Sequence, residues 1–116
     1  MRAHELSWPK VLRNEREIAA YIEQYSSSFC DVERIEDEFI GAKAVLTKVA
    51  TDSLSFGHAD ANIENRKRQQ KFNRMDASKQ PPIVVADNTV VDGNHRLRAA
   101  KMQNLPSIWV YNVIDA

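Results

Sequence analysis

The chain has 116 residues, of which 43% are hydrophobic and 28% are charged, a composition ordinary for one soluble globular domain. Lysines and arginines equal aspartates and glutamates in number, so the net charge is zero. This balance excludes a global electrostatic attraction to nucleic acid, and only local patches could supply one. Cys30 is the single cysteine, which excludes an intramolecular disulfide and a cysteine-based metal cage.

The N-terminal stretch MRAHELSWPK lacks the apolar core of a signal peptide. No run in the sequence approaches the roughly 18 apolar residues of a membrane span. We therefore expect a cytoplasmic protein that does not associate with a membrane.

Two helices are predicted in the N-terminal part, over residues 14–25 and 31–42. Each carries apolar residues at spacings of three and four, typical of one face of an amphipathic helix. In the first helix these are Ile18, Tyr21, Ile22 and Tyr25, and in the second Val32, Ile35, Phe39 and Ile40. Asn14 and Asp31 are the candidate N-caps, and Gly41 is the candidate stop signal.

The rest of the chain alternates strands and helices. The β-branched segment 44–50 predicts a strand, followed by a loop with turn-forming residues. The remaining expected elements are a helix over 63–76 with Ile63, Phe72 and Met75 buried, strands 83–86 and 89–91, a helix over 94–104, and a strand over 108–114. Asp87-Asn88 fits a hairpin turn, and Leu105-Pro106 ends the last helix. The strands before and after the helix 94–104 could form a crossover unit.

Charge is distributed unevenly along the chain. Residues 13–40 hold eight acidic residues and three arginines, which indicates a solvated outer face or a surface for a protein partner. Residues 63–76 hold five basic and two acidic residues, including Arg66, Lys67 and Arg68. This basic helix could be a solvated face, or it could contact nucleotide phosphates or a nucleic-acid backbone.

The segment 92–96, Asp-Gly-Asn-His-Arg, joins a predicted strand to a predicted helix. The unsatisfied N–H groups and the dipole of a helix N-terminus attract anions, and Gly93 lets a ligand approach the backbone. Arg96 could contact phosphate, His95 could donate a hydrogen bond, and Asp92 could orient a cation or hold magnesium. The alternative is that the turn simply caps the helix. The segment is neither a Walker loop nor a dinucleotide-binding fingerprint.

The segment QPPIVVADNTVVDGNHRLRAAKMQNLPSIWVYNV (80–113) resembles the ParB/sulfiredoxin-like superfamily. The resemblance lies in the Pro-Pro-Ile, the short hairpin, the Asp-Gly-x-His-Arg motif, the Ala-Ala helix and the final apolar strand. Residues 44–55 are similar to that family's opening strand with its Asp-x-Leu. The resemblance implies an α+β fold with a small mixed sheet, formed by residues 44–116, and a helical extension over residues 1–43.

In that family the turn and its helix bind the phosphates of CTP or ATP, so the resemblance implies ATP or CTP with magnesium as cofactor. By position, Gly93, Asn94, His95 and Arg96 would contact the nucleotide. The helix before Pro-Pro-Ile would add Arg66 and Arg68. Asp92, His95 and Arg96 would be the catalytic candidates, and Asp92 the metal ligand. Asn94 replaces the cysteine of sulfiredoxins and the glutamate of ParB proteins, which makes reductase activity improbable and puts hydrolysis in doubt.

Three functions follow as expectations. The first is nucleotide binding, with phosphoryl transfer or nucleotide hydrolysis if the domain is an enzyme. The second is a DNA-binding or nuclease-like module that uses the basic helix. The third is a protein-interaction module without catalysis, whose acidic N-terminal helices bind a partner. Short members of this superfamily occur in phages and mobile elements, and a homo-oligomer is compatible with the sequence. The spacing of His4, His58 and His95 does not suggest a metal site.

Overall fold

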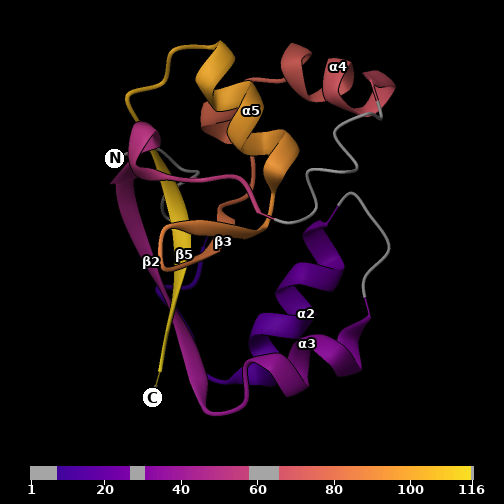
Figure 1. Cartoon of the computed structure of the whole chain (residues 1–116), viewed down its shortest axis with the longest axis vertical. Coiled ribbons are helices and arrows are strands. Elements are labelled where there is room, and N and C mark those ends of the chain that lie inside the picture. Colours follow the sequence, from indigo (N-terminus) through magenta and orange to yellow (C-terminus); the bar gives the residue numbers. More distant parts are fainter. Residues whose placement is uncertain (1–7, 27–30, 58–65, 116) are drawn as a thin grey trace.

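The computed structural model describes residues 8–26, 31–57 and 66–115. It confirms the predicted α+β class (Figure 1). The elements in chain order are β1 (Val11–Leu12), α2 (Glu15–Tyr25), α3 (Val32–Glu38), β2 (Ala42–Ala50), the 3-10 turn η1 (Thr51–Ser53), α4 (Arg66–Arg74), the 3-10 turn η3 (Ala77–Lys79), β3 (Ile83–Ala86), β4 (Thr89–Asp92), α5 (Asn94–Met102) and β5 (Ser107–Asp115). Within these ranges, no helix is long and apolar enough to cross a membrane.

The five strands form one mixed sheet in the order β1-β2-β5-β3-β4. β2 and β5 pair antiparallel from Ala42 opposite Asp115 to Ala50 opposite Ser107. β3 and β4 form the expected hairpin, in which Asp87 and Asn88 both have the positive φ that a type I′ turn requires. This hairpin places β4 at the edge of the sheet.

The strands around α5 pair differently from the crossover considered above. β5 pairs in parallel with β3, which lies between it and β4. β4 runs antiparallel to β3, so β4 and β5 run in opposite directions and do not pair with each other. The parallel connection therefore runs from β3 through both β4 and α5 to β5.

Both faces of the sheet are covered because successive strand residues point to opposite sides. Val84 and Tyr111 join a core cluster with Ile18 and Tyr21 of α2, whereas the neighbouring residues of β3 and β5 join a second cluster with Leu97 of α5. Figure 1 shows α2 beside α3 and, separately, α4 beside α5. The site at the start of α5 therefore lies on the side that α4 borders.

Residues before the predicted domain boundary at 43 contribute to this sheet. β1 pairs with β2, and the Tyr111 hydroxyl donates a hydrogen bond to Pro9 O over 2.7 Å. Asn14 caps α2 as expected, because its Oδ1 accepts a hydrogen bond from Glu17 N at 3.0 Å. The Tyr21 hydroxyl donates to Pro82 O in the Pro-Pro-Ile segment. α2 is thus fixed to the strand that leads into the hairpin.

Several predicted boundaries and burials change. The second helix ends at Glu38, before the predicted residue 42, because Gly41 has a φ of 78° and turns the chain into β2. Ile40 is consequently 70% exposed rather than buried, whereas Phe39 is only 7% exposed. The helix predicted to reach residue 104 ends at Met102. Ile63 lies outside the described residues.

Candidate functional site

Gly93 makes the sharp transition from β4 to α5. Its φ of 117° favours glycine, and a Cβ at this position would lie 2.4 Å from Cγ2 of Ile83. The first helical hydrogen bond runs from Leu97 N to Gly93 O over 2.9 Å. Gly93 is the N-cap residue, and as a glycine it has no side chain that could accept a hydrogen bond from the first turn. The preceding N–H groups of the first turn must therefore find partners outside the helix, where the helix dipole favours an anion.

Asn94, the first residue of α5, holds a neighbouring loop. Its Oδ1 accepts a hydrogen bond from Gly57 N at 2.9 Å. Gly57 itself lies against the backbone of Val90, since a Cβ there would be 2.0 Å from Val90 O. Asn94 therefore fixes the chain at residue 57 over the start of α5. The predicted loop residue His58 follows directly and lies outside the described residues.

His95 is held by a side chain of α4. Its Nδ1 lies 2.7 Å from Oε1 of Gln69, whose Nε2 donates to His95 O at 3.2 Å and to Oδ1 of Asn73 at 2.8 Å. Because the amide nitrogen has these two acceptors, Oε1 accepts a hydrogen bond from Nδ1–H of the imidazole. Phe72 stacks on the ring, with centroids 5.9 Å apart. In its neutral form His95 then carries its lone pair on Nε2.

The charge state of His95 follows from its surroundings. Burial lowers its pKa below the usual value, and the positive charges of Arg68 and Arg98 lower it further. A neutral imidazole accepts a hydrogen bond or a proton at Nε2 and adds no positive charge of its own. The positive charges that the structure places beside His95 are those of Arg68 and Arg98.

Arg96 and Asp92 form a buried ion pair, with side chains 5% and 14% exposed and a nitrogen–oxygen distance of 2.9 Å. Arg96 also donates to Pro81 O at 2.8 Å and to Tyr25 O at 3.4 Å. It therefore ties α5 to the Pro-Pro segment and to the end of α2. Burial raises the pKa of Asp92, while Arg96 and the Ser26 hydroxyl oppose this effect.

Asp92 was the predicted magnesium ligand. One carboxylate oxygen of Asp92 is committed to Arg96. No group of three or more histidine, cysteine, aspartate or glutamate residues gathers anywhere in the described part of the chain. Magnesium that accompanies a nucleotide needs only one or two carboxylates besides the phosphates, so magnesium at Asp92 stays a prediction that depends on a bound nucleotide.

Arg98 is the residue of this site that the sequence did not single out. It lies one helical turn after Asn94 on the same face of α5, and its guanidinium carbon lies 5.4 Å from the centroid of the Phe56 ring. Lys101 lies over the same ring at 5.6 Å. The buried Nε of Arg98 has no hydrogen-bond partner among the described residues. In the sequence, the spacing of four residues between Asn94 and Arg98 was the signal that could have placed Arg98 at this site.

The predicted basic residues of α4 fall into different environments. Arg68 is half-buried and its charge reaches His95, whereas Lys67 is exposed. Arg66 begins α4, and its side chain lies outside the described part. The structure therefore brings together the start of α5, His95, Arg68 and Arg98, which is an environment for an anion. Arg96 lies in the same helix but is occupied by three acceptors.

Comparison of the chain with protein-family models, with curated proteins and with solved structures found no match. The likeness of residues 80–113 to the ParB/sulfiredoxin-like superfamily remains a prediction that rests on their motif. The distances and contacts at the start of α5 do not depend on this likeness.

Proposed function

We propose that this chain is a ParB/sulfiredoxin-like domain that binds the phosphate groups of a nucleotide at the N-terminus of α5. The observation that supports the proposal is the uncapped first turn of α5 with Arg68 and Arg98 beside it. Helix N–H groups and guanidinium groups both form charge-assisted hydrogen bonds with phosphate oxygens.

The proposed nucleotide is ATP or CTP, with any magnesium held by the nucleotide's own phosphates. Phosphoryl transfer or hydrolysis would need a proton acceptor. Asp92 is paired with Arg96, and Asn94 is bound to Gly57. The neutral His95, with Nε2 as acceptor, is then the candidate base. Binding is the primary activity that we propose for this site.

The experiment is thermal unfolding with ATP or CTP, with and without magnesium. A nucleotide at one hundred times its dissociation constant stabilises the fold by about 2.7 kcal/mol. Arg98→Gln and Arg68→Gln should remove this stabilisation. Arg74→Gln, which changes an exposed arginine at the far end of α4, should retain it. Absence of stabilisation with every nucleotide would refute the proposal.

A pH titration of His95 by NMR provides a direct local measurement. A phosphate that binds beside Arg68 and Arg98 offsets the charges that lower the pKa of His95. We therefore expect the nucleotide to raise the pKa of His95 toward its usual value. An unchanged pKa at saturating nucleotide would place the ligand elsewhere.

A second candidate is binding of DNA by α4. The observation that favours it is the row of exposed basic side chains Lys67, Lys71 and Arg74 on this helix. Contacts with several phosphates make binding fall steeply with salt. Salt-sensitive DNA binding that is lost in Lys67→Gln/Lys71→Gln, without any nucleotide effect, would favour this function over the first.

A further inference from the structure

A cavity of about 200 Å³ lies along one side of α5, where Arg96 of the first turn and Ala100 line it. It is bounded by η3 and the following residues, by the loop that leads into β5, and by the end of β2. Its lining includes Lys48, Ser78, Ile83, Leu105, Ser107 and Trp109. Of the segment 92–96, only Arg96 contributes to this lining.

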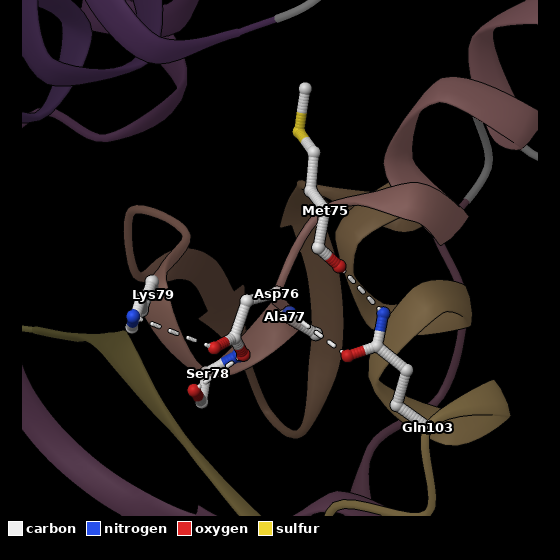
Figure 2. Close-up of polar contacts among 6 residues, drawn as sticks. All are labelled: Met75, Asp76, Ala77, Ser78, Lys79 and Gln103. Carbon is white, nitrogen blue, oxygen red and sulfur yellow. Dashed lines mark hydrogen bonds and ion pairs between the residues drawn. The ribbon is translucent and has the colours of Figure 1, made fainter.

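The wall formed by η3 is held in place by Gln103 of the chain after α5 (Figure 2). Gln103 Nε2 donates to Met75 O at 2.7 Å, and its Oε1 accepts from Ala77 N at 3.0 Å. Asp76 accepts hydrogen bonds from the backbone N and the hydroxyl of Ser78, at 3.0 and 2.6 Å. The cavity therefore has a wall that is ordered by side-chain hydrogen bonds before any ligand arrives.

The charge of the lining favours an anion. Lys48 and Arg96 are its two cations, and no lining residue is acidic. Asp92 neutralises Arg96, but Lys48 has no ion-pair partner in the described ranges of the chain. Three acceptors fix the guanidinium of Arg96, which has five N–H groups in all. Ser107 adds a hydroxyl group to the same space, whereas the hydroxyl of Ser78 already donates to Asp76.

The apolar part of the lining favours a flat ring. Trp109 presents an aromatic side chain, and the ammonium of Lys48 lies 5.9 Å from its ring centroid. Ile83 and Leu105 add aliphatic surface. A cavity of roughly 150 Å³ is large enough for benzene, so this space accommodates one aromatic ring with one small substituent.

We propose that this cavity binds a small planar organic anion, namely a monocyclic aromatic carboxylate. The ring packs against Trp109 and the aliphatic wall, and the carboxylate accepts hydrogen bonds from Lys48 and the Ser107 hydroxyl. The site is separate from the proposed nucleotide site. Binding here neither requires nor predicts nucleotide binding at the start of α5.

The test uses benzoate as the probe and follows the backbone and indole N–H signals of the full chain by NMR. We expect saturable shifts at Trp109, Ser78 and Ser107, and no such shifts with benzyl alcohol, which keeps the ring but lacks the charge. Inorganic phosphate, which keeps the charge but lacks the ring, should bind at least tenfold more weakly. Equal binding of either control compound would overturn the assigned ligand class.

Matched lysine variants locate the binding. Lys48→Gln should weaken benzoate binding at least tenfold, because it removes the unpaired cation of the lining. Lys43→Gln changes the same strand at its other end, opposite Ile114, and should bind like the unmodified chain. No saturable shift with benzoate, or equal weakening in both variants, would overturn the proposal. The nucleotide response should be the same in both variants and in the unmodified chain.

Discussion

Gly93 lies where two separate requirements exclude a side chain. Its backbone has a φ of 117°, and an added Cβ would overlap Ile83 at 2.4 Å. We expect Gly93→Ala to lower the free energy of unfolding by about 3 kcal/mol, from backbone strain together with overpacking. Gly41→Ala is the matched control, because Gly41 has a φ of 78° and nothing within 4 Å of an added Cβ. It should cost only about 1–2 kcal/mol in urea unfolding, and equal losses would contradict the close packing on Ile83.

Arg96 stabilises the fold through a buried ion pair with Asp92 and hydrogen bonds to two backbone carbonyls. Arg96→Met would leave Asp92 buried without its partner and remove the donor to Pro81 O. We expect a loss of about 3–5 kcal/mol in the free energy of unfolding. Arg13→Met breaks an exposed ion pair with Glu17, whose side chains are 80% and 34% exposed, and should cost less than about 1 kcal/mol.

A double-mutant cycle completes this measurement. Asp92→Asn/Arg96→Met should cost less than the sum of the single substitutions, because the charge that the arginine neutralises is also removed. Strict additivity would show that the ion pair contributes little. For the same reason Arg96 is a poor position at which to test nucleotide binding, since its loss disturbs the fold.

The sequence indicated that residues 92–96 have special roles, but it could not indicate which groups they contact. Gly93 was expected to be a special backbone position, and it has positive φ. Arg96 was expected to face phosphate, yet one of its acceptors is Tyr25 O, far away in the chain. A guanidinium binds a carbonyl, a carboxylate or a phosphate with the same N–H groups, so only the three-dimensional arrangement identifies the acceptor.

Among the elements, α4 is attached to α5 mainly by polar contacts. Gln69 is buried, and its side chain binds both the ring and the backbone carbonyl of His95. Gln103 adds hydrogen bonds to Asn73 O and Met75 O at its end. Few buried apolar contacts hold this helix, so it should open at a lower free energy than the sheet.

Hydrogen exchange measures this difference. We expect the amides of α4 to exchange faster than those of β5. Gln69→Ala should raise the exchange rates of the α4 amides by about another tenfold, because it removes net hydrogen-bond energy of about 1 kcal/mol or more. Gln70→Ala changes the exposed neighbour and should leave the rates unchanged. Protection of α4 equal to that of β5 would contradict a polar attachment.

Elements with strong local signals were the predictable ones. The period of apolar residues and the Asn14 cap predicted α2, and the Asp87-Asn88 pair predicted the hairpin. β1 has two residues, too few for any periodicity, and exists because it pairs with β2. The parallel partner of β5 is likewise set by sheet order rather than by any local pattern.

For the whole molecule, the sheet is a layer shared by two core clusters. α2 covers Val84 and Tyr111 on one face, while α5 covers the other face through Leu97. Neighbouring residues of β3 and β5 belong alternately to one cluster and to the other. Loss of either α2 or α5 therefore exposes buried residues of both strands. The two clusters should therefore unfold together, in one cooperative transition.

This coupling gives a test of the predicted division at residue 43. The fragment 44–116 contains the whole segment that resembles the ParB/sulfiredoxin-like superfamily, but it lacks β1 and α2, and therefore Ile18 and Tyr21 of the core. Removing even one such buried side chain, as in Ile18→Ala, costs about 2–5 kcal/mol, and a domain of this size is stable by only about 5–15 kcal/mol. We expect the fragment to show no cooperative thermal transition by circular dichroism and a poorly dispersed NMR spectrum. A fragment that melts cooperatively near the temperature of the full chain would instead establish residues 1–43 as a separable extension.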